Sequence, residues 1–284
     1  MTITLSVPSV DALPRVDAAL RTWQVEGGPL QLHPGDVGWF QRFGADETAR
    51  ALRVWATDAG ILAVGLCDGP DVLRLTTAPG VRGDTELART IADDLERTLP
   101  DGPVSVEAPT DAALRPVLEA AGWRRDEAWT PLRRGLAAPV EHVGLTVVPV
   151  GPDEVADRVS VHRSAFANST FTEERWRAMT ASPAYADARC LVGYDSEGTA
   201  VAAITVWSAG AGREGLIEPM GVHRDHRGRG YGTAITLAGA AALRDLGSSS
   251  AVVATPSSNT GGIATYRAAG FDALPERLDL RRGD

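Results

Sequence analysis

The order of strand-like and helix-like segments constrains the fold of this chain more than any other feature of its sequence. From about residue 145 onward, apolar periodicity predicts a strand, two helices, three strands, and then helix, strand, helix and strand. The long helix near the middle is expected from about Tyr231 to Leu246, closed by Gly247 as a C-cap. This order is typical of a mixed α/β (α+β) fold. The predicted segments are 145–150, 153–166, 172–185, 188–194, 199–207, 214–222, 231–246, 250–255, 259–270 and 274–282.

The first half of the chain repeats this order. Three strand-like segments lead into a strongly amphipathic helix at 85–99, which a strand, a helix and a closing strand follow. The halves also end alike, with LEAAGW at 118–123 and YRAAGF at 266–271. A shared folding pattern explains part of this likeness, but the matching offsets favour an internal duplication of roughly 140 residues. We therefore predict two domains, 1–138 and 143–284, joined by a linker rich in alanine, proline and glycine.

Charge and composition argue against several classes of function. The net charge of −9 disfavours general nucleic-acid binding, which needs a basic surface. No apolar run approaches the roughly 20 residues that span a bilayer, and the first residues lack the basic start of a signal peptide. Cys67 and Cys190 lie in separate apolar segments, which suits a reducing cytoplasm better than a disulfide framework. We expect a cytoplasmic protein that binds neither nucleic acid nor membrane.

The segment from Val222 to Ala234, VHRDHRGRGYGTA, is basic in an otherwise acidic chain. Glycines occupy every second position from 228 to 232, between a predicted strand and a predicted helix. A helix amino terminus presents unpaired N–H groups and a partial positive charge, and glycines leave these groups open to an anion. Arginines beside such a loop add charge-assisted hydrogen bonds to phosphate oxygens. The segment therefore predicts a site for a pyrophosphate group.

Two common nucleotide-binding motifs do not fit this segment. A Walker P-loop needs a lysine, and all 28 basic residues of the chain are arginines. A dinucleotide-binding turn needs the spacing G-x-G-x-x-G and an acidic residue about 20 positions later. Here the spacing is G-x-G-x-G, and the nearest acidic residue, Asp245, lies near the end of the predicted helix.

Residues Arg227–Gly232 resemble instead the R/Q-x-x-G-x-G/A signature of the GCN5-related N-acetyltransferase (GNAT) family. The segment NTGGIATYRAAGF resembles a second motif of that family, in which a tyrosine follows an asparagine by seven residues and Gly-Phe ends the helix. Asn259, Tyr266, Gly270 and Phe271 hold these positions. The likeness covers 145–284 well, whereas the first half shares only the order of elements and its Gly-Trp ending.

This resemblance implies two tandem GNAT-like domains, each with a mixed, mostly antiparallel sheet flanked by helices. It implies acetyl-CoA as the cofactor, attacked directly by an amine. The loop backbone would hold the pyrophosphate, Val222 would pair with the pantetheine arm, and Asn259 would lie near the thioester. The implied cofactor-binding residues are Val222, His223, Arg227, Gly228, Arg229, Gly230, Tyr231, Gly232, Thr233 and Asn259.

Two residues are candidates for proton transfer. Tyr266 holds the family position of an acid that protonates the departing thiolate; the alternative is an ordinary half-buried tyrosine at a helix end. Glu218 lies in an apolar strand, where a carboxylate is costly unless it has a partner or a function. It is a general base, a clamp for the substrate ammonium or part of a structural ion pair. Pro219 cannot donate a ladder hydrogen bond, so we expect an irregular strand, which suits the splayed strand of this family.

The corresponding positions of the first half are mostly changed. RGDTEL at 82–87 aligns with RGRGYG at 227–232, so two glycines are lost and two carboxylates are introduced. Counting back from the Gly-aromatic ending places Asp111 and Leu118 where the second half has asparagine and tyrosine. Acidic residues in a first helical turn satisfy the helix themselves and repel phosphate. We predict that the first half neither acetylates nor binds acetyl-CoA well.

The predicted function is an N-acetyltransferase acting on a primary amine, most simply that of a small molecule. A non-catalytic acyl-CoA-binding protein, an acetyltransferase similar to mycothiol synthase and a protein-lysine acetyltransferase are the alternatives. The acceptor site of the family usually falls near 165–176, although core packing explains the aromatic residues of that segment equally well. Residues 32–43 carry turn residues and aromatics that could line a pocket. No cluster with metal-ligand spacing accompanies His223 and His226, so we predict no metal site; the sequence leaves the oligomeric state open.

Overall fold

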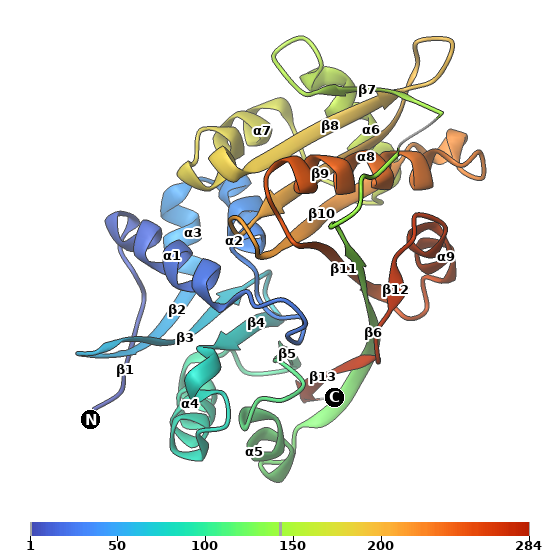
Figure 1. Ribbon diagram of the computed structural model, residues 1–284. Helices are drawn as coiled ribbons and strands as arrows, with labels where there is room; N and C mark the ends of the chain where they lie inside the picture. Colours follow the sequence, from blue (N-terminus) through green and yellow to red (C-terminus); the bar gives the residue numbers. More distant parts are fainter. Residues whose placement is uncertain (1, 142–143, 284) are drawn as a thin grey trace. The chain divides into compact units, whose positions relative to one another are not determined.

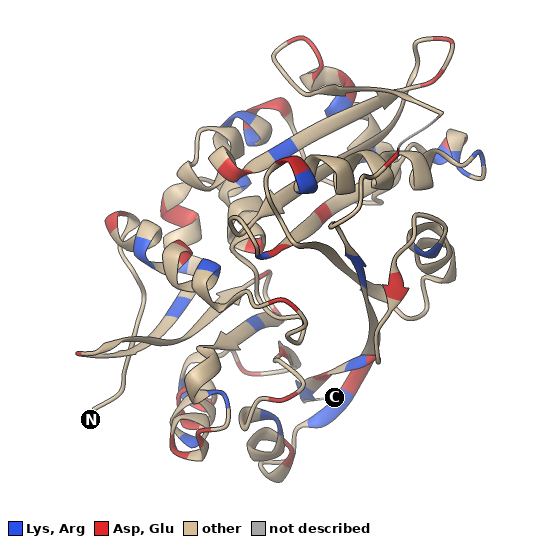
Figure 2. Cartoon of the chain, viewed as in Figure 1, with Lys and Arg blue, Asp and Glu red and all other residues tan. Residues whose placement is uncertain are grey.

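The computed structural model describes residues 2–141 and 144–283 (Figure 1). Its contacts divide the chain into two compact units. The N-terminal unit consists of Met1–His33, Ala45–Trp129 and Glu276–Asp284. The C-terminal unit consists of Pro34–Gly44 and Thr130–Pro275. Acidic and basic residues are interspersed along the elements of both units (Figure 2).

Two segments lie in the other unit from the one that a boundary at 138/143 suggests. Pro34–Gly44 belongs to the C-terminal unit, and Glu276–Asp284 belongs to the N-terminal unit. Position 143, where the second predicted domain begins, and its neighbour 142 lie outside the described residues. The chain therefore crosses between its two units more often than a simple tandem arrangement requires.

The C-terminal unit is built on a mostly antiparallel sheet with the strand order β6-β11-β10-β9-β8-β7, and β12 pairs with β6. Only β10 and β11 run parallel in this unit's described pairings. Its elements are α2 (Pro34–Phe40), the 3-10 helix η2 (Gln41–Phe43), part of β6 (Arg124–Gly135), β7 (Thr146–Pro149), α6 (Val155–Ala165), α7 (Glu173–Thr180), η4 (Pro183–Asp187), β8 (Ala188–Tyr194), β9 (Ala200–Ser208), β10 (Glu214–Val222), η5 (Arg224–His226), α8 (Tyr231–Asp245), β11 (Ser250–Pro256), α9 (Thr260–Ala268) and β12 (Asp272–Ala273).

Helices cover both faces of β9 because its side chains alternate. Ile204 and Val206 face α8, where a Cβ added to Gly239 would come within 2.5 Å of Ile204. Trp207 points to the other face, where a Cβ on Gly38 of α2 would come within 2.4 Å of its ring. The close approach of α2 to this ring explains why Pro34–Gly44 belongs to the C-terminal unit, since only glycine fits there.

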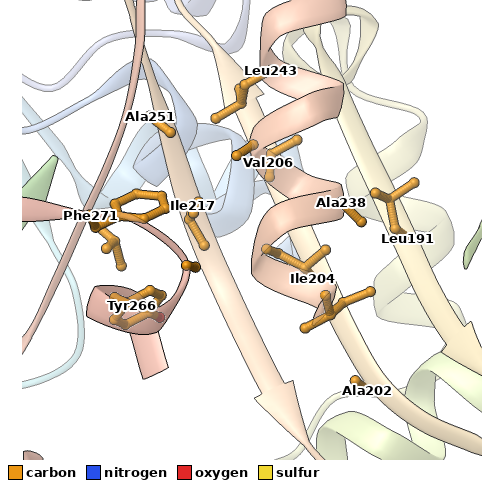
Figure 3. Packing of buried hydrophobic residues seen from close by; sticks show 14 of the residues in the cluster. Leu191, Ala202, Ile204, Val206, Ile217, Ala238, Leu243, Ala251, Tyr266 and Phe271 are labelled. Carbon is orange, nitrogen blue, oxygen red and sulfur yellow. The ribbon is translucent and has the colours of Figure 1, made fainter. Parts of the chain in front are cut away.

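The core of this unit lies between the sheet and helices α8 and α9 (Figure 3). Leucine and valine side chains from the strands meet small residues of α8, which lets the helix approach closely. At the α9 end, Tyr266 and Phe271 pack together, with ring centroids 5.9 Å apart, next to Ile217 of β10. Burial of these apolar side chains, each contributing about 1.5–3 kcal/mol, positions β10, β11 and α9 relative to one another.

The N-terminal unit has the strand order β1-β2-β3-β4-β5-β13 and then the first part of β6. Its second core contains α4, α5 and the strands they cover, with Trp55, Leu118 and Leu280 fully buried. Its elements are β1 (Thr4–Ser6), η1 (Val10–Ala12), α1 (Leu13–Trp23), α3 (Ala45–Ala51), β2 (Leu52–Thr57), β3 (Gly60–Cys67), β4 (Val72–Thr77), η3 (Pro79–Val81), α4 (Thr85–Thr98), β5 (Val104–Glu107), α5 (Leu114–Ala120), the start of β6 and β13 (Arg277–Arg282).

The predicted fold class is confirmed, and most elements lie where the sequence places them. Strands β8 and β10 have the predicted bounds, and α8 begins at Tyr231 as expected. Two helices are shorter than expected: α7, predicted over 172–185, ends at Thr180, and α5, predicted over 110–123, begins only at Leu114. Among the described residues, no helix is long and apolar enough to cross a membrane.

Candidate active site

The irregular strand that the sequence predicts is present in β10. Its register against β9 shifts between Ile217 and Met220, on either side of Glu218 and Pro219. In the described part of the chain, β10 pairs with β11 only from Glu214 to Leu216, although β11 continues to Pro256. The two strands therefore separate beyond Leu216, and the later part of β10 keeps a paired neighbour only on its β9 side.

The glycine-rich loop leads from β10 into the amino terminus of α8. Gly228 and Gly230 have φ values of 77° and 83°, in the left-handed region that favours glycine. Gly230 is the N-cap, and no side chain caps the helix. A Cβ added at either glycine would meet nothing within 4 Å. The start of α8 is thus left without a capping side chain, as an anion site at a helix amino terminus requires.

A cleft of about 690 Å³ lies along the separated part of β10 and the start of α8. We call it the cofactor cleft. Eight of the ten predicted cofactor-binding residues line it: Val222, Arg227, Gly228, Gly230, Tyr231, Gly232, Thr233 and Asn259. The other two, His223 and Arg229, are not among its described lining residues. His223 instead caps η5, where its Nδ1 accepts from the N–H of Asp225 at 3.4 Å.

Two arginines fix the loop to the carboxyl end of α6. The N–H of Arg224 donates to Ser164 Oγ at 3.0 Å, and its Nε donates to Ser164 O at 3.2 Å. Arg227 Nη2 donates to Ala165 O at 2.8 Å. Cations at a helix carboxyl terminus satisfy its last carbonyls and interact favourably with the helix dipole. This anchoring positions the loop before any ligand is bound.

Asn259 has a structural task as well as a place in the cleft. Its Oδ1 accepts from the N–H of Gly262 at 3.1 Å and so caps α9, while its Nδ2 donates to Thr255 Oγ1 at 2.8 Å. Gly261, Gly262 and Thr265 line the cleft beside it. The sequence analysis did not single out these three residues. Two glycines in the first turn after a helix cap leave the backbone accessible, so the sequence could have indicated them as part of a binding site.

Tyr266 lies in the core, with 6% of its surface exposed. Burial, and then the negative charge of Glu218, raise the pKa of the Tyr266 phenol well above its ordinary value of 10.0. The phenol therefore keeps its proton at neutral pH. The charge of Glu218 thus acts on the phenol of Tyr266, so these two predicted residues interact electrostatically.

A second cavity, of about 280 Å³, has Glu218 and Pro219 of β10 in its wall. We call it the aromatic pocket. Its lining consists of Trp39, Arg42, Phe43, His162, Phe166, Ala167, Asn168, Ser169, Thr170, Phe171, Arg175, Glu218 and Pro219. Phe166 also lines the cofactor cleft, so the two cavities are neighbours within the C-terminal unit. Three of the predicted candidates, Glu218, Phe166 and Phe171, meet here, whereas Trp176 packs in the interior.

His162 and Arg42 are residues of this pocket that sequence reasoning missed. The His162 ring lies 4.7 Å from the rings of both Phe166 and Phe171, centroid to centroid. Burial first, and then the positive charges of Arg158 and Arg42, lower the pKa of His162 to about 3. The imidazole is therefore neutral at physiological pH. Arg42 stacks over Trp39 at 4.4 Å and belongs to the segment 32–43 that the sequence marked as pocket-forming.

In the N-terminal unit, side chains of the chain itself bind the groups that correspond to this site. Asp84 caps α4 by accepting from the N–H groups of Glu86 and Leu87 at 2.8 and 3.1 Å, as predicted for an acidic first turn. Arg82 forms an ion pair with Asp111 at 3.2 Å and also donates to Gln31 Oε1 at 2.8 Å. The helix amino terminus that is open in the C-terminal unit is thus satisfied here by side chains of the chain itself.

Among the described residues there is no group of three or more histidine, cysteine or carboxylate side chains that could hold a metal ion.

Comparisons with known proteins relate part of the sequence to a family and the fold to solved structures. Residues 157–271 match the family described as Acetyltransferase (GNAT) family. A GCN5-related N-acetyltransferase from Sphaerobacter thermophilus has a similar structure, with 19% identity, coverage of 99% of this chain and 95% of that one, and a TM-score of 0.60. A tandem GNAT protein from the clavulanic acid biosynthesis pathway is similar over 99% of this chain and 98% of its own, with 19% identity and a TM-score of 0.60.

A GCN5-related N-acetyltransferase from Kribbella flavida has 22% identity and a TM-score of 0.58, over 78% of this chain and 87% of that one. No curated protein matches the chain. Residues 157–271 therefore match a domain of the GNAT family, and the fold of the chain is similar to that of a tandem GNAT protein.

Proposed function

We propose that the C-terminal unit binds acetyl-CoA in the cofactor cleft and transfers its acetyl group to a primary amine of a small molecule. The observation that carries this proposal is the separation of β10 from β11 beside an uncapped, glycine-rich helix amino terminus. A pyrophosphate needs donors without intervening side chains, and the first N–H groups of α8 supply them. The unpaired edge of β10 near Val222 can pair, strand-fashion, with the amide groups of a pantetheine arm.

The thioester supplies an activated acetyl group, and the residues of this chain bind, orient and move protons. The amine nitrogen forms a bond to the carbonyl carbon, the carbon–sulfur bond breaks, and the sulfur leaves as a thiolate. In our proposal Glu218 accepts the proton that the amine loses, and Tyr266 donates a proton to the thiolate. The raised pKa of Tyr266 keeps the phenol protonated before the transfer, as a general acid must be.

The charge of Glu218 also supports a role in holding the acceptor. An amine arrives as an ammonium ion, which a carboxylate attracts before it can accept a proton. Binding the ammonium and accepting the proton both need a carboxylate close to the reacting amine. Glu218 lines the aromatic pocket, and Met220, two residues further along β10, lines the cleft. We therefore assign Glu218 to the acceptor side and Tyr266 to the thiol side of the reaction.

We further infer that acetyl-CoA does not bind to the N-terminal unit. Its α4 is capped by Asp84, and Arg82 is engaged by Asp111 and Gln31. The backbone donors at this helix terminus already bond to Asp84, so they are not available to a phosphate. The two carboxylates of the segment RGDTEL would also repel a phosphate.

Release of the CoA thiol in the presence of a panel of primary amines tests the proposal. With an accepted amine, the Tyr266→Phe variant should lose roughly 10²- to 10⁴-fold in kcat while keeping its affinity for acetyl-CoA, since general acid catalysis contributes about that factor. Unchanged kcat in this variant would remove Tyr266 from the mechanism. Tight acetyl-CoA binding without transfer to any amine of the panel would favour a non-catalytic acyl-CoA-binding protein.

A further inference from the structure

The aromatic pocket differs in charge from the rest of the chain. The chain carries a net charge of −9, and Figure 2 shows acidic and basic residues interspersed on its elements. The pocket is lined by two arginines, Arg42 and Arg175, and by one carboxylate, that of Glu218. Its basic character is therefore local, and it calls for an explanation in terms of what the pocket binds.

The two lining arginines are held by aromatic rings and by backbone oxygens. Arg42 stacks over Trp39 at 4.4 Å and over Phe43 at 4.3 Å, and its Nη1 donates to Trp39 O at 2.9 Å. Arg175 also stacks over the ring of Phe43, at 4.9 Å, and donates through Nη1 to Thr170 O at 2.9 Å. Stacking fixes the plane of a guanidinium group and so prepares it for a carboxylate.

A third arginine adds positive charge behind the pocket wall. Arg158 is 1% exposed and lies 5.2 Å from the ring of Phe171, which lines the pocket. Within the described residues, its guanidinium donates to two uncharged groups, Cys190 Sγ at 3.3 Å and Thr205 Oγ1 at 3.4 Å. Because neither partner neutralises its charge, the field of Arg158 extends into the pocket. Burial first, and then the positive charges of Arg158 and Arg42, lower the pKa of His162 in the pocket wall.

His162 supplies an independent sign of a ligand. Its side chain lines the pocket, and only 7% of the residue is exposed. Its Nδ1 is buried and has no hydrogen-bond partner in the described part of the chain. A buried polar atom without a partner costs about 1–3 kcal/mol, so its position in a pocket wall is best explained by a group that a substrate brings.

Glu218 brings a negative charge to the same pocket. It comes from β10, whereas Arg175 comes from α7 and Arg42 from the segment after α2. The rings of Trp39, Phe166 and Phe171 provide an apolar wall. The volume of about 280 Å³ is at the small end of ligand sites, which suits a single amino acid better than a peptide chain.

We propose that the acceptor is a free amino acid with an apolar or aromatic side chain, its amine at Glu218 and its carboxylate toward Arg42, Arg175 and His162. This inference rests on the proposed acetyl transfer and specifies its acceptor. In the reaction a nitrogen–carbon bond forms as the carbon–sulfur bond of acetyl-CoA breaks. The amine proton passes to Glu218, and the products are an N-acetylated amino acid and the free CoA thiol.

Matched pairs of amines test this assignment. We would measure kcat/KM by thiol release for phenylalanine, leucine and methionine and for their decarboxylated counterparts, phenethylamine, isopentylamine and 3-methylthiopropylamine. We expect at least one amino acid to exceed its counterpart by roughly ten-fold or more, since a charge-assisted hydrogen bond contributes about 1.5–3 kcal/mol. A preference for the decarboxylated amines would overturn the assignment and leave the acetyltransferase proposal in place.

Variants of α7 connect the preference to the pocket. Arg175→Gln should lower kcat/KM for the preferred amino acid by about ten-fold more than for its decarboxylated counterpart, so that the preference between the two falls by about that factor. Arg177→Gln is the matched control, because Arg177 lies on the same helix, pairs with Glu173 at 2.7 Å and does not line the pocket. Equal effects of Arg175→Gln on both members of a pair would contradict a carboxylate contact. Absence of transfer to any amine, with or without a carboxylate, would instead refute the proposed function itself.

Discussion

Replacing Gly230 by aspartate is the sharpest perturbation of the phosphate site. Gly230 is the N-cap of α8 and has φ 83°, and a Cβ added there would meet no atom within 4 Å. The new carboxylate therefore has room to extend toward the place where the proposal puts the pyrophosphate. Asparagine is the matched control, since it has the same shape, tolerates left-handed backbone equally well and carries no charge.

The expected loss of affinity follows from the charges. Two unit charges 4 Å apart interact by about 1 kcal/mol in water and by about 4 kcal/mol at an effective dielectric constant near 20. A pyrophosphate carries about two charges and the cleft is open to solvent, so the repulsion should amount to roughly 2–4 kcal/mol. This corresponds to a Kd for acetyl-CoA about 30- to 1,000-fold higher for Gly230→Asp than for Gly230→Asn.

Backbone strain does not confuse this comparison. A residue with a Cβ in the left-handed region costs about 1–2 kcal/mol, in the presence and in the absence of ligand. Both variants should therefore lose similar free energy of unfolding, while only aspartate should lose most of the affinity. Calorimetric titration at low and at high salt is the assay, because screening should narrow the gap between the variants. Equal affinities of the two variants would refute the assignment of phosphate to this helix terminus.

Three further predictions concern the two units. Gly38→Ala should destabilise the protein by roughly 1–3 kcal/mol, because its Cβ would come within 2.4 Å of the Trp207 ring; Gly80→Ala, where nothing lies within 4 Å, is the control in thermal unfolding. Asp84→Ala should cost about 0.5–2 kcal/mol of stability through the lost cap but leave acetyl-CoA affinity unchanged in a titration. The third concerns His162, whose pKa is lowered from 6.5 to about 3 in the folded protein. As the pH drops below 6.5, the unfolded chain takes up a proton at His162 and the folded protein does not, so the free energy of unfolding falls. Between pH 7 and pH 5 we expect wild type to lose about 2 kcal/mol more than His162→Gln in urea unfolding, and equal losses would contradict a buried neutral imidazole.

Local signals predicted the elements that carry the site. The apolar pattern of 214–222 and the glycines at 228–232 are local features of the sequence. Strand β10 and the start of α8 lie where these features predict them. Asp84 likewise caps α4 as its position in the first turn indicates. Tyr266 and Glu218 were selected from motif position and strand chemistry, and after burial the charge of Glu218 contributes to the raised pKa of Tyr266.

Partners distant in sequence were not predictable in the same way. Pro34–Gly44 belongs to the C-terminal unit because Gly38 fits against Trp207, a pairing that no local pattern specifies. β13 belongs to the N-terminal unit because it pairs with β5, and its own sequence would serve equally well beside another strand. His162 lies on a helix whose apolar pattern predicts only that one face is buried. Its place in a pocket wall depends on contacts with Trp39 and Phe171, which belong to other segments of the chain.

The central claim is that one chain holds one acetyl-CoA site, formed by the separated strands β10 and β11 and the amino terminus of α8. Calorimetric titration of acetyl-CoA into the intact protein tests it most directly, with Gly230→Asp as the second sample. We expect one site per chain in the wild type and little or no binding in the variant. Two sites per chain would show that the N-terminal unit is open despite its Asp84 cap. The absence of any binding by the wild type would contradict the account of the cleft as a whole.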